Sequence, residues 1–348
     1  MTKRCEGRLR KLANQTIKEV VVITTGGTIA MGEQAPGKGA VPSLSGDDLL
    51  KVLPPLPRPV KITIDNFRNV PSAHLSLDDL WELTERVRKL CGDREDVGFV
   101  ITMGTDILEE AVYFIDLTVG QRAPVVMTGA MRTASQVGYD GYANLYHSLI
   151  VAASMEREKV GTVLVANEEI HGAREVQKTH STNVGTFISP GWGPLGWIVE
   201  GNAWFHRMNS SREAIAAKPP FSRVELIRCT AGMDGLLLEA CLQSKAAGIV
   251  VEAFGVGHVP LKIADLMEAG VKKGIPVVAV SRCSMGSVLT RTYGFPGSES
   301  DLFRRGVIMG RGITGPKARI KLTLALAAGE GLTQIKKRFM DSEFSEIS

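Results

Sequence analysis

Short apolar runs alternate with longer amphipathic segments through the first half of the chain. The pattern predicts buried strands at Val20–Thr24, Val60–Ile64, Val97–Thr102, Pro124–Thr128 and Thr162–Ala166. It predicts helices at Leu77–Leu90, Ile107–Leu117 and Gly141–Ala153. In the second helix the apolar side chains fall on one face, at Leu108, Ala111, Val112 and Ile115. This alternation favours a mostly parallel sheet with helices on both faces.

The same alternation returns at smaller scale after a polar segment, His206–Arg223, which contains Pro219-Pro220 and fits a linker. Strands are predicted at Val224–Arg228, Gly248–Glu252 and Pro276–Val280. Helices are predicted at Leu236–Lys245, Leu261–Lys272 and Pro316–Ala327, with Thr314 as the N-cap of the last. A length of 348 residues suits two domains. We therefore expect an α/β protein with a larger N-terminal domain (19–205), a linker (206–223) and a smaller C-terminal α/β domain (224–348).

Positive charge is concentrated in a predicted N-terminal extension, residues 1–18, which holds six basic residues and one acid. The rest of the chain holds 35 basic and 36 acidic residues, so it offers no electrostatic footprint for nucleic acid. No apolar run approaches the length of a membrane span, and no apolar segment of an export signal follows the basic residues. We expect a cytoplasmic protein that binds neither nucleic acid nor membrane.

Cysteine and histidine give no sign of a metal site. The five cysteines are odd in number and have no C-x-x-C spacing, which favours free thiols in a reducing compartment. The six histidines are scattered without metal-ligand spacing. Gly310–Gly315 matches G-x-G-x-x-G, but no βαβ unit follows it, so a dinucleotide site is disfavoured. We expect neither a metal nor an organic cofactor.

Three loops that follow predicted strands carry candidate chemistry, because open α/β sheets bind ligands at the carboxyl ends of their strands. Thr25–Ala30 has two glycines between threonines, and on pattern alone it also fits a phosphate-binding loop. Thr102–Glu110 offers a hydroxyl at Thr105 and a carboxylate at Asp106, although Asp106 with Glu109 also fits a helix-capping box. A lone lysine such as Lys178 is ordinarily solvated, and it gains a role only if the fold brings it to Thr105.

These segments together resemble the bacterial-type L-asparaginase and glutaminase family, over Glu19 to about Ala328. Five motifs occur in the family's order: Thr25–Ala30, Met103–Glu110, Val126–Arg132, Asp140-Gly141 with Asn144-Leu145, and Arg174–Thr179. The resemblance implies an α/β amidohydrolase that releases ammonia from L-asparagine and needs no cofactor.

The resemblance also implies roles for single residues. Thr28 corresponds to the threonine that attacks the side-chain amide, and Thr105, Asp106 and Lys178 correspond to a second catalytic cluster. Ser72 corresponds to the serine that holds the substrate α-carboxylate, while Asp106 also holds the α-ammonium group. The family forms homotetramers, as dimers of dimers, in which a neighbouring subunit completes the site; the corresponding residues are His258 and Glu299.

The chemistry of the loops agrees with these roles. A threonine hydroxyl is a poor nucleophile until a base or a charge activates it. A lysine amine serves as a base only after losing its own proton, which burial or nearby positive charge favours. Backbone N–H groups around Gly27, Gly104 and Ala130 are placed to stabilise a tetrahedral oxyanion.

Some positions depart from the family pattern. Met103 replaces a histidine, Ile107 replaces a threonine, and His258 stands where asparagine is usual. Residues 31–46 contain no tyrosine, although the family's mobile loop often supplies one to align the nucleophile. Met103 either lines the site or faces the strand–helix interface.

Two other functions stay open on the sequence. One is an amidohydrolase of the same fold that acts on glutamine or another amino-acid amide. The other is a non-catalytic amino-acid-binding protein on this scaffold, which the joint presence of Thr28, Thr105 and Lys178 argues against.

Overall fold

The structure is a computed structural model that describes residues 17–32, 41–42, 46–155, 161–208 and 213–340. Contacts divide the chain between Ala214 and Ile215 into two compact units, and the predicted linker spans this point. Residues 1–16 of the predicted extension lie outside the described residues. Ile17 is buried in the core of the first unit, so that unit begins at least two residues before the predicted boundary. The other predicted domain bounds stay predictions.

The centre of the first unit is a parallel sheet built from the strands that the apolar runs predict. In sheet order these are β4 (Lys61–Asn66), β1 (Glu19–Thr24), β5 (Val97–Thr102), β6 (Val125–Thr128) and β7 (Val163–Ala166). Because the strands run in parallel, their carboxyl ends meet at one edge of the sheet. All six residues of β5 are buried, as expected for a strand covered on both faces.

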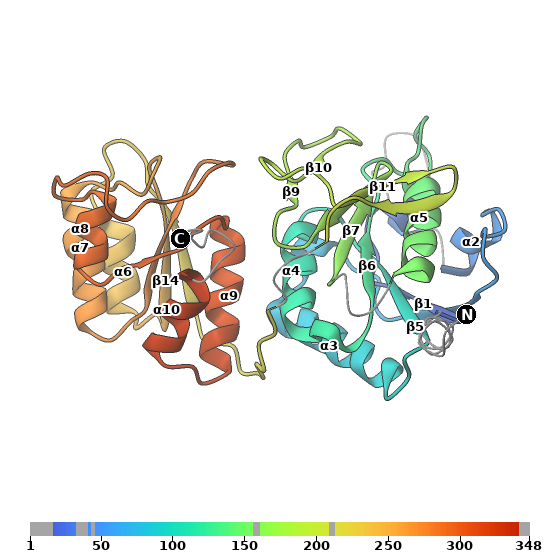
Figure 1. Ribbon diagram of the computed structural model, residues 1–348, viewed down its shortest axis with the longest axis horizontal. Coiled ribbons are helices and arrows are strands. Elements are labelled where there is room, and N and C mark those ends of the chain that lie inside the picture. Colours follow the sequence, from blue (N-terminus) through green and yellow to red (C-terminus); the bar gives the residue numbers. More distant parts are fainter. Residues whose placement is uncertain (1–16, 33–40, 43–45, 156–160, 209–212, 341–348) are drawn as a thin grey trace, which may run out of the picture. The chain divides into compact units, whose positions relative to one another are not determined.

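Helices cover both faces of this sheet, as predicted (Figure 1). The helices are α3 (Leu77–Cys91), α4 (Leu108–Val119) and α5 (Gly141–Ser154). One set of alternating strand residues, including Val20, Val22 and Val100, packs with Leu145 and Leu149 of α5 in a single core cluster. α4 packs on the other face and against α3. The predicted helices and the observed ones agree to within two residues at each end.

Three antiparallel strands that the apolar pattern does not predict extend the sheet beyond β7. They are β8 (Glu169–Gly172), β11 (Gly196–Val199) and β12 (Asn202–Phe205). Two separate pairs also form, β2 (Met31–Gly32) with β3 (Val41–Pro42) and β9 (Gln177–Lys178) with β10 (Phe187–Ile188). The remaining elements are α2 (Gly46–Lys51) and the short 3-10 helices η1 (Thr28–Ala30), η2 (Ser72–His74) and η3 (Gly120–Arg122).

The second unit is a smaller parallel sheet in the order β13 (Val224–Arg228), β14 (Gly248–Ala253), β15 (Val277–Ser281) and β16 (Ile308–Met309). α6 (Leu236–Gln243), α7 (Leu261–Lys272) and α8 (Glu299–Arg304) lie on one side of it, and α9 (Gly315–Ala327) lies on the other (Figure 1). α10 (Leu332–Met340) follows α9 and contacts it through the ring of Phe339. Thr314 occupies the N-cap position of α9, as predicted, but its side chain makes no capping bond.

Candidate active site

The loops that follow β1 and β5 touch each other at two glycines. Gly27 has φ of 89°, a backbone conformation that favours glycine, and a Cβ placed on it would lie 2.3 Å from the backbone nitrogen of Gly104. η1 begins at the next residue, Thr28, whose side chain is half-buried. The contact therefore sets Thr28 beside the turn that carries Thr105, at the ends of two strands whose register pairs Thr24 with Thr102.

The loop after β4 packs against the same turn. A Cβ on Gly104 would lie 2.6 Å from Oγ of Ser72, which begins η2 and is only 2% exposed. The backbone N–H of Asp106 donates to that Ser72 oxygen over 3.3 Å. A hydroxyl that accepts in this way retains its own proton for a further acceptor, such as a carboxylate.

The loop after β6 closes the group from the other side. A Cβ on Gly129 would lie 2.5 Å from the Met103 carbonyl oxygen and 3.1 Å from Cγ2 of Thr105. Ala130 is buried beside it. Four loops at the carboxyl ends of neighbouring strands therefore bring Gly27, Ser72, Gly104 and Ala130 into one region.

Lys178 reaches this region from β9. Its Nζ donates to Oγ1 of Thr105 over 2.9 Å and lies 3.4 Å from Oδ1 of Asp106. The Lys178 side chain is 18% exposed, whereas the Asp106 side chain is 65% exposed and faces solvent at the rim of the cluster. The fold thus brings Lys178 to Thr105, which is what a functional role for this lysine requires.

The capping box at Asp106 and Glu109, which the sequence pattern left open as an alternative, does not form. α4 begins at Leu108 with Ile107 as its N-cap, and no side chain caps it. Glu109 instead accepts the backbone N–H of Lys178. Asp106 lies in the turn before the helix, where its carboxylate faces the Lys178 amine. Asp106 and Glu109 therefore both contact Lys178 of β9, and neither caps the helix.

His258 and Glu299 form a pair within the second unit. Nε2 of His258 lies 3.1 Å from a Glu299 carboxylate oxygen, and the imidazole packs edge-on against Tyr293 and Phe295. Burial alone raises the pKa of Glu299, but hydrogen bonds from the backbone N–H groups of Tyr293 and Thr292 and from His258 hold its pKa below the ordinary value. Glu299 is fully buried and His258 is partly exposed. Their predicted contribution to a neighbouring subunit's site stays a prediction.

Comparison with known proteins agrees with this arrangement. The family described as "Asparaginase, N-terminal" matches residues 19–211, and the "Glutaminase/Asparaginase C-terminal domain" matches residues 223–339. The chain belongs to the asparaginase family. It is an amidohydrolase of this family, and its substrate is a small-molecule amide.

Relatives span nearly the whole asparaginase-family chain. An L-asparaginase of Bacillus licheniformis is 36% identical over 311 residues, which cover 89% of this chain and 96% of the relative. A glutaminase-asparaginase of Pseudomonas fluorescens biotype A is 27% identical over 340 residues, covering 95% and 91%. The crystal structure of a probable cytoplasmic L-asparaginase from Campylobacter jejuni superposes with a TM-score of 0.82 at 29% identity, covering 93% of this chain and 99% of that one.

One departure from the asparaginase-family pattern is placed by the structure. Met103 is fully buried, and its backbone N–H donates to the Thr128 carbonyl, so its side chain packs within the core. Most of the loop without tyrosine lies outside the described residues.

The sequence motif that includes Asp140 and Asn144 gave no role to these residues, which brace the candidate loops of this asparaginase-family chain. Nδ2 of Asn144 donates to the Gly129 carbonyl and to Asp140, and its Oδ1 accepts the backbone N–H of Asn167. Asn144 therefore ties the loop after β6 to the end of β7. The available signal was the spacing of Asp140 and Asn144 at the start of a predicted helix, which places both side chains on one face.

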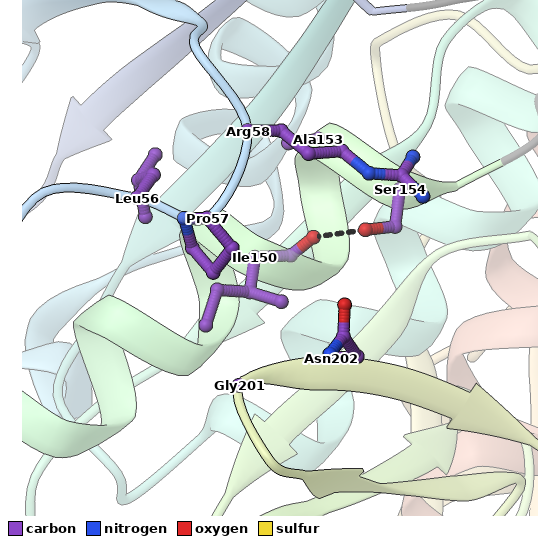
Figure 2. A pocket seen from close by; sticks show the side chains of 8 residues that line it. All are labelled: Leu56, Pro57, Arg58, Ile150, Ala153, Ser154, Gly201 and Asn202. Carbon is purple, nitrogen blue, oxygen red and sulfur yellow. Dashed lines mark hydrogen bonds between the residues drawn. The ribbon is translucent and has the colours of Figure 1, made fainter.

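Two surface pockets lie away from the candidate site. One of about 10 Å³, room for a single water, is lined by Leu56, Pro57, Arg58, Ile150, Ala153, Ser154, Gly201 and Asn202 (Figure 2). A larger one of about 390 Å³ lies over the start of β4, at Val60 and Ile62, which is the end of the strand opposite the candidate loops. None of the predicted site residues lines either pocket.

The described part of the chain carries no helix both long and apolar enough to span a bilayer. Within the same ranges, Cys229, Cys241 and Cys283 are free thiols. The described residues also include no cluster of three or more metal-ligating side chains. The absence of a cofactor stays a prediction.

Proposed function

We propose that the protein is an L-asparaginase that hydrolyses L-asparagine to L-aspartate and ammonia, with Thr28 as its nucleophile. The observation that carries the proposal is the 2.9 Å hydrogen bond from Lys178 to Thr105, one residue from the contact between Gly104 and Gly27. A lysine that is only 18% exposed and donates to a threonine hydroxyl is unlike an ordinary solvated surface lysine. In this proposal Thr28, Thr105 and Lys178 act as one reacting group.

In the first step, Oγ1 of Thr28 forms a bond to the amide carbon of the substrate. The carbonyl oxygen becomes an oxyanion, which the backbone N–H groups around Gly27, Gly104 and Ala130 stabilise. The carbon–nitrogen bond then breaks, and the nitrogen leaves as ammonia. It takes up one proton, which balances the proton that Thr28 loses. The product of this step is a β-aspartyl ester of Thr28.

In the second step, water attacks the ester carbon, Thr28 regains a hydroxyl proton, and aspartate leaves.

Thr105 and Lys178 handle the proton of the first step. Lys178 donates to Oγ1 of Thr105, so the Thr105 proton points away from the lysine. In that orientation the Thr105 hydroxyl donates to the leaving nitrogen, and the lysine supplies or receives the proton behind it.

The α-groups of the substrate match the rim of the same cluster. Asp106 presents a largely exposed carboxylate to the α-ammonium group. Ser72 retains a hydroxyl proton for the α-carboxylate, since its oxygen accepts from the Asp106 backbone. Both contacts require an unblocked amino acid, so the proposal excludes amides that lack these groups.

Ammonia release from a panel of amides tests the proposal. We expect the purified protein to hydrolyse asparagine, to act on glutamine more slowly, and to leave N-acetyl-asparagine and propionamide intact. Equal rates on glutamine would favour the alternative, an amidohydrolase of the glutaminase type. Binding of asparagine or aspartate by calorimetry without any ammonia release would identify a non-catalytic amino-acid-binding protein instead.

The proposal includes a cytoplasmic homotetramer, a dimer of dimers, in which His258 and, through it, Glu299 contribute to a neighbouring subunit's site. The part-exposed imidazole of His258 is the member of the pair that another chain can reach. Light scattering at assay concentration should give the mass of a tetramer, and His258→Ala should lower activity with little change in melting temperature. A fully active monomer would rule out the shared site.

A further inference from the structure

The loop between β6 and α5 holds the segment that follows Thr28. The hydroxyl of Tyr139 donates to the backbone carbonyl of Ile29. The backbone N–H of Ala134 donates to the carbonyl of Met31 over 3.0 Å. These two bonds tie a loop more than 100 residues away in the sequence to the residues directly after Thr28.

This loop is itself braced. Both oxygens of the Asp140 carboxylate are engaged, since they accept the backbone N–H groups of Met131 and Arg132 over 3.0 Å each. The guanidinium of Arg132 donates to the Gly138 carbonyl over 2.9 Å. The two ends of the loop are therefore fixed to each other, and Tyr139 is presented from a rigid support.

The ring of Tyr139 crosses the start of α5, where only a glycine leaves room for it. A Cβ on Gly141 would lie 2.1 Å from the Tyr139 hydroxyl oxygen and 2.2 Å from the ring carbon that bears it. Tyr142 packs edge-on against the same ring, with centroids 4.8 Å apart. Burial, with smaller contributions from Tyr142 and Asp140, raises the pKa of the Tyr139 hydroxyl, so the group stays a donor throughout the working range of pH.

Thr28 needs such a support on its carboxyl side. It begins a three-residue 3-10 helix whose N-cap, Gly27, makes no side-chain capping bond. Gly27 also has the freest backbone of any residue type. Tyr139 supplies this support one residue further along, because the Ile29 carbonyl that it holds belongs to the peptide that joins Ile29 to Ala30.

We propose that Tyr139 is a positioning residue for Thr28, which acts by fixing the Ile29 carbonyl. This inference rests on the proposed role of Thr28 as the nucleophile. Tyr139 does not touch the reacting atoms; it sets the angle from which the Thr28 hydroxyl approaches the amide carbon. Misplacement of a reacting group by about 1 Å costs roughly 100-fold in rate.

Tyr139→Phe tests the inference, because it keeps the ring and removes the hydroxyl. We expect kcat for asparagine to fall by about tenfold or more, with KM and the dissociation constant of aspartate unchanged within about twofold. The pH profile of kcat should keep its shape, since the hydroxyl transfers no proton. An unchanged kcat, or a parallel loss of aspartate binding, would overturn the inference.

Two further variants separate positioning from stability. Tyr142→Phe is the matched control, since it removes a hydroxyl from the neighbouring ring, and kcat should not change. Gly141→Ala should displace the Tyr139 ring and lower kcat, and because the new methyl group overlaps that ring the melting temperature should fall as well. A loss of kcat in Tyr139→Phe that appears only at temperatures where the variant unfolds would contradict a positioning role.

The experiment also separates this inference from the proposed function. If Thr28→Ala abolishes ammonia release while Tyr139→Phe is fully active, the nucleophile stands and only the positioning role fails. If Thr28→Ala stays active, the proposed function fails first. In the Thr28→Ala background Tyr139→Phe should have no further effect on residual activity, and an added loss there would show that Tyr139 acts on something other than Thr28.

Discussion

Thr28→Ala should lower kcat for asparagine by about four orders of magnitude and leave the protein folded. The variant lacks the oxygen that forms the ester, and no step of the proposed reaction bypasses it. The Thr28 side chain is only half-buried, so its loss should change the free energy of unfolding by less than about 1 kcal/mol. Steady-state ammonia release, thermal melting and aspartate binding measure the three quantities.

Thr25→Ala is the matched control within the same motif. Thr25 is buried and its hydroxyl donates to the Thr102 carbonyl over 3.0 Å, so it is a structural threonine. We expect this variant to lose about 1–2 kcal/mol of stability and to keep kcat within a few fold. If Thr25→Ala loses activity as completely as Thr28→Ala, the motif is sensitive as a whole and the nucleophile is not identified.

Lys178→Met should lower kcat by about three orders of magnitude, within the range for loss of general acid–base catalysis. Methionine matches the length of the lysine stem but offers Thr105 no donor and no proton. The backbone bond from residue 178 to Glu109 should survive, since it does not involve the side chain. Aspartate binding should weaken only modestly, because Asp106 and Ser72 are intact.

Lys61 provides the matched control, because its replacement removes the ammonium group of an exposed lysine outside the candidate site. Nζ of Lys61 lies 3.2 Å from Glu19 with 69% of the Lys61 side chain exposed. Lys61→Met should change stability by less than about 1 kcal/mol and leave kcat unchanged. Near-normal ammonia release by folded Lys178→Met would reduce Lys178 to the same class and refute its catalytic role.

The central strands were predictable because apolar runs bounded by turn residues have few other interpretations. The edge strands were not. β7 turns into β8 through Asn167 and Glu168, which both have positive φ, yet neither is the glycine that usually marks such a two-residue turn. β8 and β12 are also only four residues long. β12 has exposed positions in alternation, and β8, although its last three residues are buried, includes Glu169 and His171, so neither strand is an apolar run in the sequence.

The loops of the site were predictable from their motifs, but the contacts that join them were not. Glu109 and Lys178 are 69 residues apart, and only the β8–β9 connection brings them together. Local pattern assigned Glu109 to a capping box because acid residues at that spacing often cap helices. Tyr139 carried no signal at all, since its partner is a backbone carbonyl and any residue can supply one.

The site draws its residues from regions of unequal local stability. Thr28 and Thr105 follow fully paired central strands, whereas Lys178 lies in a two-residue strand whose sole ladder partner is equally short. Small peripheral pairings open at lower free energy than the core, and they do so without global unfolding. Opening of β9 from β10 would carry the lysine away while the helices and the central sheet persist. Mild heat or denaturant should therefore abolish ammonia release before circular dichroism detects any loss of secondary structure. Amide hydrogen exchange at residues 177–188 should become faster under the same conditions.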